Sequence, residues 1–307
     1  MAGTKEIKRR IKSVKNTNKI TKAMELVAAS KMKRAVSATL ASRLYAQYSS
    51  EILASIAETL KDSTNPFFNE RSEGKTLVVL ITSNRGLCGG YNSQVIKKAV
   101  LKLRDLSALG SQESLKHSPE EIDVVTVGKK GDAAMRRINQ NITEVFTDLP
   151  DVDIHLADVR PLSKLIMDEY KINTYKKVYI IYTQFVSALL QRPTIKQVLP
   201  ISKEEVAEAL LWQGQSKASA TKTDYLFEGN KDELIASFAE KITRMQIYQM
   251  ILESNAGEQS SRMVAMKNAS DASLEMIGDL TLAFNKARQA NITREISEIS
   301  AGMTSVS

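Results

Sequence analysis

The chain has 307 residues, of which 43% are apolar and 25% charged, and its formal net charge is +8. An apolar content of this size suffices for one sizeable core. The single cysteine excludes an internal disulfide and a cysteine-based metal cluster, and no uninterrupted apolar run approaches the roughly 20 residues of a membrane-spanning helix.

A long helix is the first predicted element, over residues 1–61, because residues 4–61 contain neither glycine nor proline. At about 1.5 Å of rise per residue it would be roughly 85 Å long. A short apolar stripe is made by Ile7, Ile11 and Val14, and Ile20, Met24 and Val27 follow it. Further on, a second stripe comprises Val36, Leu40, Leu44, Tyr48, Ile52, Ile56 and Leu60. The residues of the second stripe recur every four residues, which exceeds the helical period, so the stripe turns around the helix and can serve more than one partner.

The positive charge is concentrated in this first helix. Residues 1–34 carry eleven lysines and arginines against two glutamates, so the rest of the chain is nearly neutral. Such a stretch is compatible with a presequence, a nucleic-acid arm or a face for an acidic protein partner. No aromatic residue for base stacking and no zinc or helix-turn-helix pattern accompanies it, which disfavours nucleic acid.

Residues 75–201 are predicted to form one central α/β domain. Apolar, β-branched runs predict strands over 75–83, 121–128, 143–149, 177–185 and 194–201. Helices are expected over 92–105, 129–139 and 161–170, the last starting at Pro161. A polar insertion covers 107–120. Strands that alternate with helices of this length indicate a Rossmann-like, mainly parallel sheet.

A polar stretch over 202–230 is interpreted as a linker, and it leads into a second long helix over 231–301, which has no proline and two glycines. A weak 3-4 pattern runs along its second half: Met263, Met266, Ser270, Ser273, Ile277, Leu280, Phe284, Ala287, Asn291 and Arg294. This pattern suits a two-stranded coil with the first helix. We interpret Ser270, Ser273, Asn291 and Arg294 as positions that face another partner.

The loop Gly86-Leu87-Cys88-Gly89-Gly90 follows a strand and precedes a helix, as a nucleophile elbow does. One alternative function is therefore a cysteine hydrolase that uses Cys88. Its base would have to be His117 or His155, and neither is clearly placed to serve. A second interpretation is a tight turn that needs glycine for positive φ. The loop lacks the residues of a phosphate-binding P-loop or dinucleotide turn.

Four blocks of the chain resemble a known family, in order and at its spacing. They are ITKAMELVAASKMKRA (20–35), TSNRGLCGGYN (82–92), SRMVAMKNASDAS (261–273) and NKARQANITREISEI (285–299). The chain resembles the gamma subunit of the F-type ATP synthase along nearly its whole length. The least characteristic stretches are 107–120 and 202–224.

The resemblance implies a non-catalytic rotor shaft. It implies that the two terminal helices form an antiparallel coiled coil, which lies on the axis of a hexamer of alternating alpha and beta subunits. The α/β domain would rest, with the epsilon subunit, on the ring of c subunits in the membrane. Ion flow would turn the shaft, and the shaft would impose different conformations on catalytic sites in the beta subunits. No cofactor, metal or nucleic acid is implied, and one copy per complex is expected.

The resemblance also implies contact residues. The expected contacts with the alpha and beta subunits are Lys19, Lys22, Met24, Lys31, Lys33, Arg34, Arg85, Cys88, Arg262, Arg288, Gln289 and Thr293. An apolar bearing at the far end of the hexamer would take Ile296, Ile299, Met303 and Val306. Each of these residues has a second interpretation as an ordinary coil or surface residue.

Two features narrow the expected source. Chloroplast members carry a redox-active cysteine pair, whereas this chain has only Cys88. The first matching block begins close to Met1, which leaves no room for a cleaved presequence. We therefore expect a peripheral protein at the cytoplasmic face of a bacterial cell membrane.

Overall fold

The computed structural model describes residues 2–57, 67–69, 71, 73–112, 121–201 and 231–304. The chain forms two compact units: unit 1 comprises Met1–Ala29 and Arg262–Ser307, and unit 2 comprises Ser30–Ser261. Both long helices therefore contribute to both units. The stretch 202–230, which the sequence suggests is a linker, lies outside the described residues.

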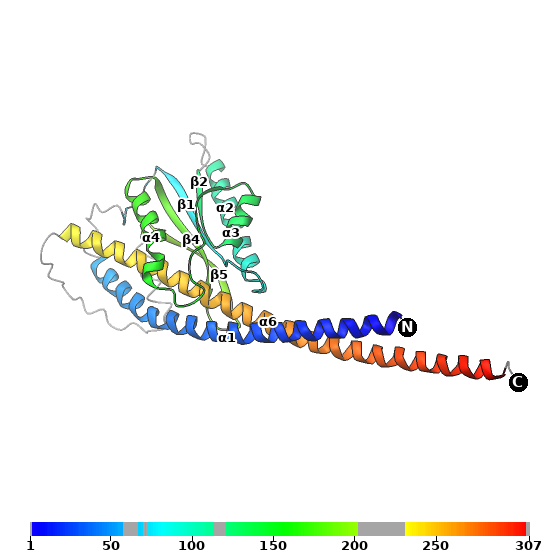
Figure 1. The fold of residues 1–307 in the computed structure, drawn as a ribbon. Helices are drawn as coiled ribbons and strands as arrows, with labels where there is room; N and C mark the ends of the chain where they lie inside the picture. The colour runs from blue at the N-terminus through cyan, green and yellow to red at the C-terminus, as the bar shows by residue number, and fades with distance from the viewer. Residues whose placement is uncertain are drawn as a thin grey trace. The chain divides into compact units, whose positions relative to one another are not determined.

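The long helices are α1, Ala2–Ala57, and α6, Lys231–Thr304. In unit 1 they lie side by side and run antiparallel, with the N-terminus of α1 and the C-terminus of α6 at the same end (Figure 1). This confirms the predicted antiparallel helix pair. Residues 58–61, predicted to end the first helix, lie outside the described part.

Unit 2 contains a five-stranded sheet in the order β3-β2-β1-β4-β5. The strands are β1 Lys75–Ile81, β2 Ile122–Val127, β3 Asn141–Phe146, β4 Tyr175–Phe185 and β5 Gln191–Leu199. Strands β1 to β4 pair in parallel, and β4 and β5 form an antiparallel hairpin. The predicted Rossmann-like, mainly parallel sheet is thus confirmed, with the last strand reversed.

Helices cover both faces of this sheet. On one face, α2 (Tyr91–Gln112) and α3 (Lys129–Arg137) pack on Val78, Leu80 and Val124. On the other face, α4 (Leu156–Lys171) and the first part of α6 pack on Leu77, Val79 and Ile180. Alternate residues of β1 serve opposite faces, as the strand period of two requires. Because both faces of β1 are buried, its sequence is apolar throughout, which is what made it predictable.

Two helix boundaries differ from the predicted ones. Helix α4 begins at Leu156, and Pro161 lies inside it, so proline does not start this helix. The start is set instead by Asp158, whose carboxylate accepts the backbone N–H of His155 at 2.8 Å and closes the first turn. Helix α2 continues to Gln112, so the first residues of the polar insertion are helical, and 113–120 lie outside the described part.

Candidate partner-contact surfaces

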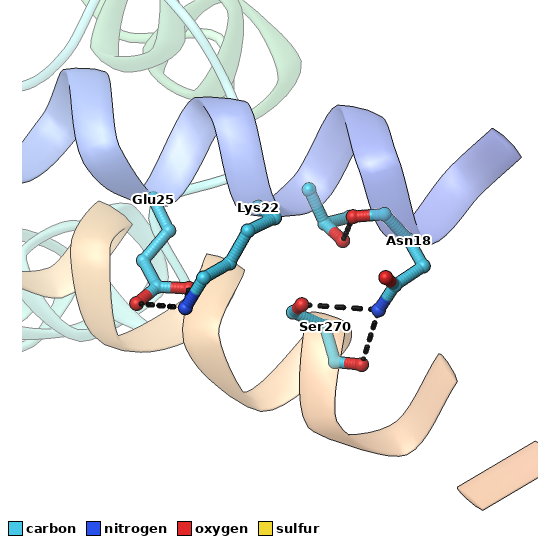
Figure 2. Close-up of polar contacts among 5 residues, drawn as sticks. Asn18, Lys22, Glu25 and Ser270 are labelled. Carbon is cyan, nitrogen blue, oxygen red and sulfur yellow. Dashed lines mark hydrogen bonds and ion pairs between the residues drawn. The ribbon is translucent and has the colours of Figure 1, made fainter. Parts of the chain in front are cut away.

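The seam between α1 and α6 in unit 1 is partly polar. Asn18 Nδ2 donates to the backbone oxygen of Ser270 at 2.8 Å and to its Oγ at 3.1 Å (Figure 2). Ser270 is 3% exposed, and Thr21, Ala28, Met266 and Ser273 are also buried. Ser270 and Ser273 therefore face α1, and their interpretation as partner-facing positions is wrong. The 3-4 spacing that includes them correctly marks the α6 side of the seam.

The outside of the same helix pair carries apolar side chains. On α1, the exposed fractions are 61% for Ile20, 63% for Leu26 and 57% for Val27. On α6, Leu274, Met276, Leu282 and Ile292 are likewise exposed. Ile20 and Val27 were expected to extend the stripe of Ile7, Ile11 and Val14. Asn18, Thr21, Glu25 and Ala28 follow Val14 at heptad spacing and are less exposed than Ile20 and Val27.

The predicted contact residues of unit 1 lie at several levels of the pair. Lys19 is exposed, Met24 is half-buried, and Lys22 forms an ion pair with Glu25 at 3.0 Å on the same helix (Figure 2). Arg262 is half-buried. Near the end of α6, Arg288, Gln289 and Thr293 are exposed, and Thr293 Oγ1 donates to the backbone oxygen of Gln289 at 3.0 Å.

The four residues expected in an apolar bearing are at the C-terminal end of α6. Ile296 and Ile299 are exposed on the helix surface. Met303 belongs to the helix by its backbone, and Val306 lies outside the described residues. Two of the four thus present apolar side chains that are open to a partner.

In unit 2, cations of α1 meet an acidic segment of the same chain. Lys31 Nζ lies 3.0 Å from Asp151 Oδ2, and an Arg34 guanidinium nitrogen lies 3.0 Å from Asp153 Oδ2. Lys33 is exposed. Sequence reasoning missed both aspartates, because they lie about 120 residues from their partners and no periodicity connects such distant positions. The only signal was two acidic residues between a strand and a helix.

The glycine loop turns back tightly between β1 and α2. Gly89 has φ 56° and Leu87 has φ 62°, which supports the interpretation as a turn that needs positive φ. An Arg85 guanidinium nitrogen lies 3.5 Å from Asp151 Oδ2, and the side chain of Arg85 is largely exposed. Cys88 is only 2% exposed, so its side chain faces the loop interior.

The surroundings of Cys88 do not support a hydrolase. The thiol lies 3.1 Å from Asn92 Nδ2 and 3.9 Å from Ser83 Oγ, and neither group is a general base. Of the two histidines considered as a base, His155 directly precedes α4, where its backbone N–H donates to Asp158. His117 lies outside the described residues. The asparagine and serine instead hold the turn together.

The carboxyl edge of a parallel sheet is where α/β proteins commonly bind ligands. Here side chains of α6 and of the segment after β3 occupy that edge and leave a cleft of about 40 Å³, which is space for water. Tyr91 and Glu258 are among its lining residues. Burial, with a smaller contribution from Glu258, raises the pKa of Tyr91, so this phenol is neutral at physiological pH and no activated nucleophile.

Metal sites and membrane-spanning helices are two further possibilities for the residues that the structure describes. No group of histidine, cysteine, aspartate and glutamate there could hold a metal ion. Nor does any helix in the described part of the chain combine the length and apolarity needed to cross a membrane.

Comparison with known proteins matches the whole chain. A family model described as ATP synthase covers residues 3–306. The ATP synthase gamma chain of Acidithiobacillus ferrooxidans is 38% identical over 309 residues and covers 100% of both chains. That of Legionella pneumophila is 35% identical over 302 residues, covering 98% of this chain and 99% of the relative.

Solved structures share the fold. One is a chain of the OSCP/F1/c-ring part of the Euglena gracilis mitochondrial ATP synthase, with TM-score 0.64, 17% identity and coverage of 99% of this chain and 95% of that chain. Another is from the central stalk and c-ring of the Tetrahymena thermophila enzyme, with TM-score 0.53, 25% identity and coverage of 82% and 99%. The two long helices, the five-stranded sheet and the full-length sequence matches agree: the chain belongs to the gamma-chain family of ATP synthase.

Proposed function

We propose that this chain is the non-catalytic central-stalk rotor subunit of an F-type ATP synthase. It couples ion flow through a ring of c subunits to ATP synthesis or hydrolysis at the beta subunits by rotating. The full-length gamma-chain relatives support this role, as do the fold neighbours from a central stalk and from an assembly of F1 with a c-ring.

One observation on this chain carries the proposal: the helix pair of unit 1 has polar groups in its seam and apolar groups outside. Ser270 and Thr21 are buried, whereas Ile20, Leu26 and Val27 are exposed. A coil that functions in water has the opposite arrangement. Full burial of one such side chain by a partner contributes roughly 1.5–3 kcal/mol, so enclosure in a ring of subunits stabilises this surface.

The surface is also asymmetric, because α1 and α6 present different side chains. An asymmetric shaft offers each of three equivalent beta subunits a different set of contacts. Only such a difference in contact free energy can hold identical subunits in different conformations. This gives the shaft a role in catalysis without a catalytic group of its own.

The basic residues supply contacts that can exchange during rotation. Lys19, Lys22, Lys33 and Arg34 are exposed, and Lys22 and Arg34 are paired with acidic groups of this chain. Exposed ion pairs contribute only about 0–1 kcal/mol, so a lysine can move from an internal carboxylate to one on a passing subunit at small cost. We assign these four residues, with Met24, Lys31, Arg85 and Arg262, to the lower contacts with the alpha and beta subunits.

The last part of α6 is assigned to the upper contacts. Arg288, Gln289 and Thr293 offer exposed hydrogen-bonding groups to a catalytic subunit. Ile296 and Ile299 then present apolar side chains to a sleeve at the far end of the hexamer. Apolar contacts lack directional bonds, which suits a surface that turns against its surroundings.

The proposed location is the cytoplasmic face of a bacterial cell membrane, where the α/β domain rests on the c-ring together with the epsilon subunit. The named relatives are bacterial. Membrane association is indirect in this arrangement, through the c-ring.

The test is reconstitution of the full chain with alpha and beta subunits. We expect one copy of this chain per three beta subunits and cooperative ATPase activity in the complex. The double variant Leu26→Ser/Val27→Ser should bind the ring more weakly while the melting temperature of the free chain stays unchanged, because both side chains are already exposed before assembly.

The matched control is Lys15→Ser/Asn16→Ser, which changes two exposed polar residues on the same helix. This control should assemble like the unaltered chain. A stoichiometry of three copies per hexamer, or equal assembly of both double variants, would contradict the proposed function.

A further inference from the structure

The loop between β3 and α4, residues 147–155, receives side-chain bonds from three other segments of unit 2. Two cations come from α1, two side chains come from the glycine loop, and two come from α6. The residues that reach the loop are Lys31, Arg34, Asn84, Arg85, Tyr248 and Asn255. The loop therefore connects both long helices to the carboxyl edge of the sheet.

Asp151 is the centre of these contacts. Its Oδ2 lies 3.0 Å from Lys31 Nζ of α1 and 3.5 Å from an Arg85 nitrogen of the glycine loop. Its backbone oxygen accepts Asn255 Nδ2 of α6 at 3.0 Å. The side chains of Lys31 and Asp151 are 24% and 29% exposed, so solvent ions screen this pair less than they screen a surface pair.

The same loop is anchored in the core on its inner side. Ile154 is buried in the cluster that includes Leu77 and Ile180 of the sheet, and Leu149 packs against that cluster. The backbone oxygen of Ile154 also accepts the Tyr248 hydroxyl of α6 at 2.9 Å. A movement of the sheet is thus passed to the loop by close packing, and from the loop to α1 and α6 by polar bonds.

We propose that Asp151 is a positioning residue that transmits turning force between the sheet and the two long helices. This inference rests on the proposed rotor function. Bonds from three directions to one residue oppose displacement along each of them, whereas a single surface pair opposes displacement along one line. The nearby pair of Asp153 and Arg34 is of that second kind, since both side chains are more than half exposed.

The test measures ion pumping under load. The complete complex, containing the full chain, is reconstituted in sealed phospholipid vesicles and supplied with MgATP, and a fluorescent probe follows the ion gradient. In D151N we expect an unchanged ATPase rate in the absence of a gradient. The maximal gradient that this variant reaches should be lower than that of the unaltered complex. Asp153→Asn is the matched control, and it should reach the gradient of the unaltered complex. D151E keeps the carboxylate and should restore part of the gradient.

The load dependence separates a positioning role from a structural one. A variant that only destabilises the chain lowers the melting temperature and the ATPase rate with and without a gradient, and that result would overturn the proposal. If D151N does not assemble, Asn255→Ala removes the bond from α6 to the backbone oxygen of Asp151, leaves both ion pairs in place and should also lower the maximal gradient. Failure of both to assemble, or a normal gradient in either, would also overturn it.

The proposed function is tested by the unaltered chain in the same assay. If the unaltered complex neither assembles nor pumps, the rotor function itself fails. If it pumps and D151N pumps equally well against the same gradient, only the role of Asp151 fails.

Discussion

Units 1 and 2 differ in where their apolar side chains lie. Unit 2 buries Leu77, Val79, Ile180 and many others between a sheet and its helices. Unit 1 buries serine and threonine in its seam and exposes Ile20 and Leu26. Unit 2 therefore holds most of its stabilising contacts within itself, whereas unit 1 leaves much of its apolar surface exposed, where we propose that other subunits bind. Apolar residues can thus mark a core where they are buried and a candidate interface where they are exposed.

The largest expected effect is in unit 2. A Cβ at Gly128 would lie 2.3 Å from the backbone oxygen of Thr82, and Gly128 has φ 94°. We expect Gly128→Ala to lower the free energy of unfolding by about 3 kcal/mol, through backbone strain and overpacking. Urea denaturation of the free chain measures this. Gly86→Ala is the control, since nothing lies within 4 Å of a Cβ there. If Gly128→Ala lowered the free energy of unfolding no more than Gly86→Ala does, the predicted strain at Gly128 would be contradicted.

A smaller effect is expected for the polar seam of unit 1. Asn18→Ala removes both bonds to Ser270 and should lower the stability of the helix pair by about 1 kcal/mol. Amide hydrogen exchange around residues 18 and 270 measures this locally, so a change confined to unit 1 is visible. Asn16→Ala on the exposed face is the control. Equal exchange rates in both variants would mean that the seam bonds contribute nothing.

The sheet of unit 2 should show a dependence on alkaline pH. Burial, and then Asp123, raises the pKa of Tyr175 to about 12. Its hydroxyl donates to Asp123 Oδ2 at 3.2 Å. Because the unfolded pKa is about 10, the stability from the neutral phenol is complete below pH 10 and is lost as the pH rises towards 12.

Tyr175→Phe should therefore cost about 1 kcal/mol at neutral pH through the lost hydrogen bond and should flatten the decline in stability between pH 10 and 12. Tyr91 and Tyr182 also have raised pKa values, so part of the decline remains. Denaturation at a series of pH values measures both effects. An unchanged pH profile in the variant would contradict the assignment to Tyr175.

The smallest expected effect compares two glycines of one helix. A Cβ at Gly278, in unit 1, meets nothing within 4 Å, so Gly278→Ala should stabilise α6 by about 0.5–1 kcal/mol. A Cβ at Gly257, in unit 2, would lie 3.3 Å from Thr183 Cγ2 and 3.5 Å from Gln191 Cγ. Gly257→Ala should therefore stabilise α6 less than Gly278→Ala does, or should destabilise it. Hydrogen exchange along α6 distinguishes the two. Equal stabilisation of α6 by both variants would contradict the expected difference in packing around the two glycines.

The fold was largely predictable from the sequence, for a physical reason. The strands of unit 2 are buried on both faces, so runs such as Leu77–Ile81 stand out. The 3-4 spacing from Met263 onward correctly located the seam of α6, even where its residues are serines. On α1 the apolar residues gave a wrong prediction of the seam, because Ile20 and Val27 are exposed and lie outside it. Apolar periodicity marks any face that becomes buried, and a helix with two partners has two such faces.

The contact residues were less predictable. The burial of Cys88 and the pairing of Lys31 with Asp151 depend on which distant loops meet, and that information lies in the assembled sheet. The sequence motifs pointed to Lys31 and Arg85, but they did not indicate that the carboxylate of Asp151 lies close to both side chains. The roles proposed for Arg288, Gln289 and Ile296 depend on partner surfaces, so they remain predictions for the reconstitution experiments.

The bond between Asn18 and Ser270 joins positions 252 residues apart. During synthesis at about 5–20 residues per second, the ribosome needs roughly 10–50 s to make the intervening chain. Throughout that time the N-terminal segment has no α6 to pair with. Its many like charges keep it apart from other nascent chains in this interval. The concentration of positive charge near the N-terminus thus favours a soluble chain while it is being made.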